Sequence, residues 1–348
     1  MSEPCAVSVI ALVGAGGNLG RYVLFGLKNS PYKFEIRTLS RKLAPPKGSD
    51  SNHHVQVDFD NEERLKESLR GCEFLINCMG TSGDYHGSKM ALVHAAAAAG
   101  VYGYITSDFG VDYNTPSIHF DHPVWVEKKQ HLEYSKSLGL RTLAICPGLF
   151  LEQPFGAFGP WHGFDHNSKS FFVAGTGKQR ISVTSKLDIG AAVARVCHLV
   201  LSTEAKQNHS QIQPLSKKDY IRISGHAVTP YQVVDLANRN SETEDGKGGD
   251  QCENWKVQAL TSEEQCQSFQ SSMKVVAMDE EAESVLDHDG GFDPEVASQV
   301  AGRVFRAMGD GTLHFAENDN ELLNPRQQYW KWSQLTNFEQ DTKAKGLW

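Results

Sequence analysis

The sequence predicts an α/β fold in which a doubly wound parallel sheet is joined to a smaller C-terminal lobe. Over the first 150 residues, short apolar runs rich in β-branched residues alternate with segments of helical periodicity. Glycine and polar clusters separate these segments, as expected between strands and helices. Between residues 151 and 184 the sequence is rich in aromatic residues and glycine and has little helical period. Regular alternation of strand and helix is typical of a parallel sheet covered by helices on both faces.

Each expected strand is a short apolar run that ends in glycine or polar residues. These strands are 7–13, 34–40, 55–59, 74–79, 102–106 and 141–146. Helices are expected after residue 19 and at 89–99 and 123–137, and a further helix opens on Asp60 and Glu63 as a capping box. Ligands of such sheets bind beyond the carboxyl ends of the strands, so the site is expected at that edge.

The second half of the chain, 151–348, is expected to form a lobe that faces the substrate. A helix at 187–201, with Asp188 in its first turn, is expected to return to the first domain. A strand at 220–224 and a capped helix at 229–238 follow. The polar, acidic stretch 241–254 has the composition of a flexible insertion.

Composition limits the classes of function. The 348 residues are 40% hydrophobic, which is enough for a well-packed core. A formal net charge of −8 gives a nucleic-acid partner no electrostatic support. No stretch approaches the ~20 apolar residues of a membrane span, and the first apolar run is too short for a signal peptide. Seven scattered cysteines without CxxC pairing are typical of reduced thiols, so we expect a cytoplasmic protein. The oligomeric state stays open.

The stretch 7–21, VSVIALVGAGGNLGR, has the order strand, glycine turn and helix. Gly14, Gly17 and Gly20 satisfy G-x-x-G-x-x-G, whereas Leu19 breaks the G-x-G-x-x-G pattern. Glycines allow the backbone to approach a pyrophosphate, and the free N–H groups at the helix start point at it. The stretch therefore predicts a Rossmann-like dinucleotide site.

The end of the second strand distinguishes the two nicotinamide cofactors. An acidic residue there accepts bonds from the ribose hydroxyls of NAD, whereas basic residues bind the 2′-phosphate of NADP. Arg41 and Lys42 occupy this end, and Glu35 opens the strand instead of closing it. NADP is therefore favoured, although a solvated loop with two chance cations stays open as the alternative.

These motifs, in this order, resemble the NmrA-like and isoflavone-reductase-like branch of the atypical short-chain dehydrogenases. The matching pieces are GAGGNLGR at 14–21, SRK at 40–42, VDFD at 57–60, LRGCEFLI at 69–76, AAAAAGVYGYITSDFG at 95–110, WVEKKQ at 125–130, GLRTLAICPGLF at 139–150 and LDIG at 187–190. The resemblance covers about 1–240, and beyond it ELLNP at 321–325 and the tryptophan-rich tail look like fungal members.

The resemblance implies a set of residues that bind the cofactor. Those at the pyrophosphate are Gly14, Gly17, Asn18, Leu19 and Gly20. Those at the 2′-phosphate and the adenine are Arg41, Lys42, Asp58 and Phe59. Those along the nicotinamide are Cys78, Met79 and the covering turn with Pro147 and Leu149.

Lys128 occupies the position of the family's active-site lysine. Such a lysine can bond the nicotinamide ribose and protonate or polarise a substrate oxygen. A purely ribose-binding role and a plain surface cation stay open. Tyr85 and Lys89 match the Tyr-x-x-x-Lys spacing of typical short-chain dehydrogenases, but they follow the fourth strand and not the fifth. We interpret that pair as a coincidence, so alcohol oxidation driven by a tyrosine is disfavoured.

Aromatic residues gather close to the nicotinamide turn and are candidates for a flat-substrate pocket or for ordinary core. They are Phe109, Phe150, Phe155, Phe158, Trp161 and Phe164. Two polar clusters, one of His119, Asp121 and His122 and one of His162, Asp165 and His166, are weak metal candidates. We expect them to be solvated loop groups, and no metal is predicted.

Taken together, we expect an NADP-binding domain at 1–150 and a substrate-binding lobe at 151–348. The expected activity is hydride delivery from NADPH to an aromatic or alkaloid-like small molecule, with Lys128 stabilising the developing anion. The resemblance to fungal members implies secondary metabolism. A redox-neutral cyclase or isomerase that retains NADP stays open, as does a non-enzymatic NADP-sensing regulator.

Overall fold

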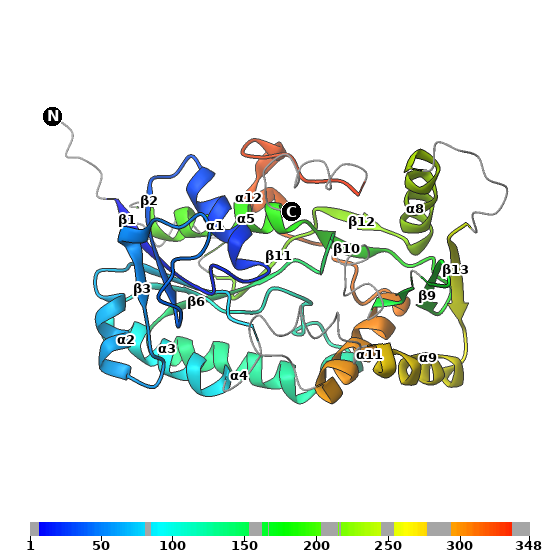
Figure 1. Ribbon diagram of the computed structural model, residues 1–348, viewed down its shortest axis with the longest axis horizontal. Coiled ribbons are helices and arrows are strands. Elements are labelled where there is room, and N and C mark those ends of the chain that lie inside the picture. Colours follow the sequence, from blue (N-terminus) through cyan, green and yellow to red (C-terminus); the bar gives the residue numbers. More distant parts are fainter. Residues whose placement is uncertain are drawn as a thin grey trace.

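The computed structural model describes residues 7–80, 85–152, 162–165, 167–202, 215, 217–244, 254–276 and 294–335. Its centre is a seven-stranded sheet in the order β11-β6-β5-β4-β1-β2-β3 (Figure 1). The strands are β1 (Ser8–Val13), β2 (Phe34–Ser40), β3 (His54–Gln56), β4 (Phe74–Asn77), β5 (Gly103–Ile105), β6 (Arg141–Cys146) and β11 (Tyr220–Arg222). Every pairing in this sheet is parallel, which confirms the predicted doubly wound fold. Within these ranges, no helix has the length and apolar character needed to cross a membrane.

Helices cover both faces of the sheet because alternate residues of a strand point to opposite sides. Ile10 and Leu12 of β1 are buried against α1 (Gly20–Asn29) and α5 (Lys186–Leu201). Ala11 and Val13 point the other way, into a core shared with α2 (Glu62–Leu69) and α3 (Tyr85–Ala99). Figure 1 shows α4 (Pro123–Ser137) beside α3 on that second side. A strand that is buried on both faces is apolar throughout, which explains its continuous hydrophobic run.

Several boundaries differ from the prediction. β3, β4, β5 and β11 are shorter than expected, and α3 begins at Tyr85 and not at residue 89. Asn61, not Asp60, caps α2, because its side chain accepts a hydrogen bond from the backbone N–H of Arg64 at 3.0 Å. α8 (Pro230–Glu244) is longer than the expected helix, so the first four residues of the stretch 241–254 are helical. Residues 245–253 lie outside the described residues.

Two small sheets build most of the second half. One has the order β12 (His226–Val228), β10 (Ile181–Thr184), β7 (Leu149–Phe150). The other has the order β13 (Lys256–Leu260), β9 (Ser170–Ala174), β8 (Phe164–Asp165). They pack with α8, α9 (Glu263–Val276) and α11 (Pro294–Asp310) at the end of the molecule away from β1 (Figure 1). The short strands within 151–184 were not predicted from the sequence.

The chain returns to the central sheet after residue 150 through α5 and β11. α5 crosses α1 at two glycines, where the backbones almost touch. A Cβ on Gly190 would lie 2.2 Å from the carbonyl oxygen of Tyr22, and one on Gly26 would lie 2.3 Å from the carbonyl carbon of Gly190. Only glycine allows two helices to approach this closely.

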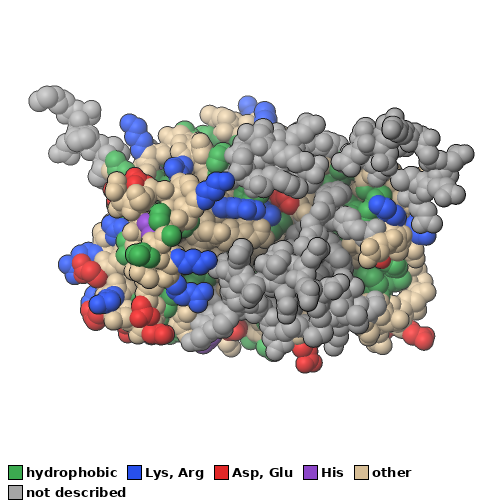
Figure 2. Space-filling view, in the orientation of Figure 1, with side chains coloured by type: hydrophobic (Ala, Val, Ile, Leu, Met, Phe, Trp, Pro, Cys, Tyr) green, Lys and Arg blue, Asp and Glu red, His purple; other side chains and the backbone are tan. Residues whose placement is uncertain are grey.

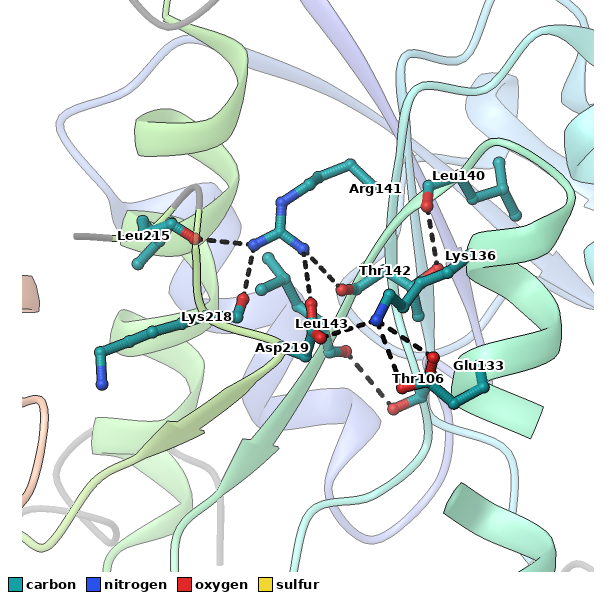
Figure 3. A network of polar contacts seen from close by, with 10 residues as sticks. All are labelled: Thr106, Glu133, Lys136, Leu140, Arg141, Thr142, Leu143, Leu215, Lys218 and Asp219. Carbon is teal, nitrogen blue, oxygen red and sulfur yellow. Dashed lines mark hydrogen bonds and ion pairs between the residues drawn. The ribbon is translucent and has the colours of Figure 1, made fainter. Parts of the chain in front are cut away.

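Arg141 fastens the segment before β11 to the edge of β6 (Figure 3). Its guanidinium donates to three carbonyl groups, those of Thr142, Leu215 and Lys218, at 2.8, 2.7 and 2.5 Å. Asp219 lies 3.5 Å from the same guanidinium and accepts a hydrogen bond from Lys136 of α4 at 2.7 Å. This partly buried cation of β6 therefore adds to the strand pairing that holds β11 at the edge of the sheet.

Asp188 lies in the first turn of α5, as predicted. Its side chain is 4% exposed, and one carboxylate oxygen accepts a hydrogen bond from the backbone N–H of Ser333 at 2.8 Å. Burial raises the pKa of this carboxyl to about 7. This buried acid thus connects the last described segment of the chain to α5, as does Arg195, which donates to the carbonyl oxygen of Leu323 at 3.2 Å.

Replacing Gly190 by alanine tests the helix crossing. We expect Gly190→Ala to lower the free energy of unfolding by about 1–3 kcal/mol, because the added methyl group forces the two backbones apart. Urea denaturation measures the change. Gly80→Ala is the matched control, since no atom lies within 4 Å of a Cβ built there. Equal stability of the two variants would contradict the close approach.

Asp188 also predicts how stability changes with pH. Because its pKa is raised in the folded state, the native protein binds more protons than the unfolded chain between about pH 4 and pH 7. Stability therefore falls as the pH rises through that window, by roughly 1 kcal/mol per unit. Asp188→Asn should flatten this slope in urea titrations at pH 5 and pH 7. An unchanged slope would show that the carboxyl is ionised throughout.

Candidate functional site

The loop between β1 and α1 passes very close to the end of β4. Gly14 has a φ of +78°, and a Cβ there would lie 2.5 Å from the carbonyl oxygen of Cys78. A Cβ on Gly20 would lie 1.9 Å from the carbonyl oxygen of Gly14. The backbone N–H of Gly17 donates to that same oxygen at 3.0 Å. Gly14 and Gly20 are thus required by one compact turn, in which the Gly17 amide bonds to the carbonyl oxygen of Gly14.

At the start of α1 the backbone amides of Arg21 and Tyr22 bond to the carbonyl oxygens of Gly17 and Leu19 at 3.3 and 2.9 Å. Among the described residues, the amides that remain for a ligand are those just before them, at 18–20. Leu19 stands at the N-cap position, where it provides no capping hydrogen bond, and the first turn contains no acidic residue. The first amides of a helix lack partners inside the helix, and the dipole makes that end positive. This is the arrangement that binds phosphate groups, so the residues present fit the predicted pyrophosphate.

The turn after β2 has a fixed backbone and exposed cationic side chains. Gln56 donates to the carbonyl oxygen of Arg41 at 3.0 Å, and the backbone N–H of Lys42 donates to Ser40 Oγ at 3.1 Å. In the part of the chain that the structure describes, neither Arg41 nor Lys42 forms an ion pair. Both charges are therefore free to meet a phosphate.

The two residues expected at the adenine have different surroundings. Asp58 is exposed and accepts a hydrogen bond from the backbone N–H of Asp60 at 3.1 Å. Phe59 is only 8% exposed, in the core under α2. Its ring therefore contributes mainly to packing.

The ends of β4 and β5 are joined beside the glycine loop. Asn77 accepts a hydrogen bond from the backbone N–H of Met79 at 2.9 Å, and Ser107 Oγ donates to the carbonyl oxygen of Met79 at 2.6 Å. Burial raises the pKa of the Cys78 thiol, which keeps it protonated. Cys78 and Met79 thus lie at the strand end that touches Gly14, where the nicotinamide side was predicted.

Lys128 of α4 points at these same strand ends. Its ammonium donates to the carbonyl oxygen of Ser107 at 3.2 Å and lies 3.4 Å from Asp108 Oδ1. The side chain of Lys128 is 19% exposed and that of Asp108 is 3% exposed. The cation is therefore held at the sheet edge by a buried acid, and a solvated surface position does not describe it.

Asp108 and Tyr113 are site residues that the sequence reasoning missed. Asp108 Oδ2 accepts hydrogen bonds from Thr106 Oγ1 at 2.5 Å and from the hydroxyl of Tyr113 at 3.1 Å. Burial, together with the Asp108 charge, raises the pKa of Tyr113. The carboxylate of Asp108 thus lies between the Tyr113 hydroxyl and the Lys128 ammonium and contacts both. Tyr113 and Lys128 do not have the Tyr-x-x-x-Lys spacing. The available signal was the polar run TSD directly after an apolar strand.

The Tyr85 and Lys89 pair does not reach this edge through its lysine. Lys89 is 2% exposed and forms an ion pair with Glu127 of α4, which also lies 3.1 Å from His86 Nδ1. These contacts tie α3 to α4. Because Lys89 joins two helices through this ion pair, its position agrees with the interpretation of the Tyr-x-x-x-Lys spacing as a coincidence.

The first histidine cluster contacts α11. His119 bonds to Asp310 at 2.8 Å, His122 bonds to Gln299 at 3.0 Å, and Asp121 pairs with Arg303. In the second cluster, Asp165 accepts a hydrogen bond from Ser168 at 2.6 Å, and residue 166 lies outside the described residues. Across the described ranges, no group of three His, Cys, Asp or Glu residues could hold a metal ion.

The turn after β6 is anchored from two sides. The carbonyl oxygen of Pro147 accepts a hydrogen bond from Thr184 at 2.8 Å, and the backbone N–H of Gly148 donates to Gly110 at 3.1 Å. Leu149 is buried, whereas Phe109 and Phe150 keep partly exposed rings.

Of the other aromatic candidates, Phe164 is fully buried and stacks on Trp255 with ring centroids 4.2 Å apart, so it belongs to the core. Phe155, Phe158 and Trp161 lie outside the described residues.

A family model and several known proteins match this chain. The model of the NmrA-like family matches residues 6–244. The chain belongs to the NmrA-like family. A curated relative, the oxidoreductase aprR of Aspergillus flavus, is 29% identical over 189 residues. That match covers 53% of this chain and 62% of the relative, so it spans less than two thirds of the relative's length.

Solved structures share the fold of this NmrA-like protein at low sequence identity. The NADPH complex of an NADPH-dependent quinone oxidoreductase from Escherichia coli has a TM-score of 0.62 at 18% identity, and the match covers 96% of this chain and 99% of that chain. An isoflavone reductase has 0.63 at 13% identity, covering 97% and 100%. AtPrR2 with NADP+ and (+)pinoresinol has 0.64 at 15% identity, covering 96% and 98%. These likenesses show the fold alone.

Proposed function

We propose that this NmrA-like protein is an NADPH-dependent oxidoreductase that reduces an aromatic or alkaloid-like small molecule. The observation that carries the proposal is that the glycine loop and Lys128 meet at one edge of the sheet. Gly14 touches Cys78, Met79 follows it, and Ser107 connects Met79 to the ammonium of Lys128. The glycine turn and the partly buried ammonium of Lys128 therefore lie at neighbouring strand ends, which supports a shared cofactor and substrate site.

The residues present fit NADP(H), which supplies a hydride from its nicotinamide ring when it is bound. The turn with Gly14, Gly17, Asn18, Leu19 and Gly20 binds the pyrophosphate through backbone donors. Arg41 and Lys42, which are exposed and form no ion pair with any described residue, bind the 2′-phosphate. The names of the E. coli and AtPrR2 structures, which include NADPH and NADP+, support this choice.

Lys128 supplies the proton or the hydrogen bond at the substrate oxygen on which negative charge develops. Its ammonium is held between Ser107 and Asp108, so little reorganisation is needed when the charge forms. Asp108 is itself held by Thr106 and Tyr113, which fixes the direction of the pair. Asp108 acts as a positioning residue through Lys128.

An aromatic substrate is supported by the partly exposed rings of Phe109 and Phe150 next to the anchored turn at 147–150. The names of three solved structures with this fold also support an aromatic substrate, because quinones, isoflavone and pinoresinol contain aromatic or conjugated rings. The Aspergillus relative is named an oxidoreductase, which supports the reaction class. The proposed role in fungal secondary metabolism follows from the resemblance of the sequence to fungal members.

Arg41→Ala tests the choice of cofactor. We expect NADPH binding to weaken by about 1.5–3 kcal/mol, the scale of a charge-assisted contact, and NADH binding to weaken much less. Isothermal titration calorimetry measures both affinities. Lys33→Ala, which removes an exposed cation at the opposite end of β2, is the matched control. Equal losses for the two cofactors would refute the 2′-phosphate assignment.

Lys128→Ala tests the chemistry on a panel of quinones and conjugated aromatic ketones. We expect kcat to fall by about 10²–10⁴-fold, the usual contribution of a positioned acid. The absorbance of reduced nicotinamide measures turnover, and Lys129→Ala, with an exposed side chain on the same helix, is the control.

Three outcomes would contradict this role. A loss of NADPH affinity with unchanged kcat would reduce Lys128 to a ribose contact. Substrate converted without NADPH consumption would reject the reductase in favour of redox-neutral catalysis. Partner binding that is retained in Lys128→Ala, without any turnover by the wild type, would indicate a regulator.

A further inference from the structure

Lys186 opens α5, yet its ammonium lies at the glycine loop. The Nζ atom donates a hydrogen bond to Asn18 Oδ1 at 2.9 Å, across 168 residues of sequence. It also lies 5.3 Å from the centre of the Tyr22 ring on α1 and 6.0 Å from that of Phe150. The sequence predicts that the helix at 187–201 returns to the first domain, but no motif links Lys186 to the predicted cofactor residues, which all lie before residue 150.

The hydrogen-bond partner of the Lys186 ammonium is the neutral side chain of Asn18. Among the described residues, Lys186 forms no ion pair within 4.0 Å. Glu152, the acid beside it, uses Oε1 to accept the backbone N–H of Lys186 at 3.0 Å. Its Oε2 has no hydrogen-bond partner among the residues that the structure describes, and Glu152 is 7% exposed. A partly desolvated cation without an ion pair is costly, so an anion that reached it would be stabilising.

A second cation lies nearby. The guanidinium of Arg21 is 5.1 Å from the centre of the same Tyr22 ring. Burial lowers the pKa of Lys186, the carboxylate of Glu152 opposes that shift, and the charge of Arg21 adds to it. The space-filling view shows Lys and Arg side chains gathered over α1 and α5 on this face (Figure 2). The positive start of α1, which has no acidic residue in its first turn, adds to the same field.

We propose that Lys186 is a phosphate-binding residue whose ammonium exchanges Asn18 Oδ1 for an oxygen of a bound pyrophosphate. The inference rests on the dinucleotide site of the proposed function and adds to it a contact from the second half of the chain. The pyrophosphate is common to NADPH and NADH. Lys186 therefore contributes affinity for either cofactor, whereas Arg41 distinguishes between them.

Two fragments of the cofactor separate these contributions. ADP-ribose contains the pyrophosphate and lacks the 2′-phosphate, whereas adenosine 2′-monophosphate contains the 2′-phosphate and lacks the pyrophosphate. With the full chain in a calorimeter, Lys186→Gln lowers the affinity for ADP-ribose and for NADPH by about tenfold to a hundredfold. It leaves the affinity for adenosine 2′-monophosphate unchanged. Arg41→Ala lowers the affinity for adenosine 2′-monophosphate and for NADPH and leaves the affinity for ADP-ribose unchanged.

The matched control is Lys178→Gln, which removes the same charge from an exposed side chain in the turn between β9 and β10. This control variant binds ADP-ribose like the wild type. Equal affinity of Lys186→Gln and wild type for ADP-ribose overturns the proposal. Equal losses for both fragments overturn it too, because they indicate a general disturbance of the site.

A measurement on the wild-type protein keeps the proposal falsifiable if Lys186→Gln does not fold. The chain is acetylated at its lysines with an N-hydroxysuccinimide ester, and the modified peptides are quantified by mass spectrometry. ADP-ribose protects Lys186 from acetylation, and adenosine 2′-monophosphate does not. Equal acetylation of Lys186 with and without ADP-ribose overturns the proposal.

These results are independent of the reductase chemistry. Loss of the Lys186 contact leaves the reductase proposal standing, because turnover tests Lys128. Conversely, a chain that binds ADP-ribose through Lys186 but consumes no NADPH with any substrate overturns the reductase and retains the phosphate contact.

Discussion

The site depends on one close approach of two backbones. At Gly14 the chain leaves β1 and passes the carbonyl group of Cys78 so closely that a Cβ would lie 2.5 Å from its oxygen. Gly20 brings the start of α1 still closer to Gly14, since a Cβ on Gly20 would lie 1.9 Å from the carbonyl oxygen of Gly14. Side chains at these positions would push α1 away from the ends of β4 and β5. The free amides of the helix would then no longer share an edge with Lys128.

Cations from three separate elements are placed around this edge in different ways. Lys128 is fixed by the buried carboxylate of Asp108, so its ammonium keeps one position. Within the described ranges, the ammonium of Lys186 has the neutral amide of Asn18 as its one hydrogen-bond acceptor, so a ligand can replace this partner at low cost. Arg41 is exposed and pairs with no acid of the described chain. An anchored cation suits proton transfer, and replaceable partners suit the binding of phosphate groups.

The two halves of the chain are interlocked. α5 packs on α1 where Gly190 meets Tyr22, and Asp188 connects the same helix to Ser333 near the end of the described chain. Arg141 fastens β11 to the opposite edge of the sheet. The expected division at residue 150 therefore separates sequence regions, while the central sheet is completed by elements from both.

Local physics made much of this predictable from the sequence. Hydrophobic periodicity and the torsional freedom of glycine determined the parallel sheet, its helices and the turn at Gly14, because these depend on neighbouring residues. The helix cap was ambiguous, since Asp60 and Asn61 are adjacent and both can cap. Only the tertiary structure decided the short strands within 151–184, the carboxylate beside Lys128 and the position of Lys186. Those features are long-range contacts between segments up to 168 residues apart, and no local pattern encodes which distant groups will meet.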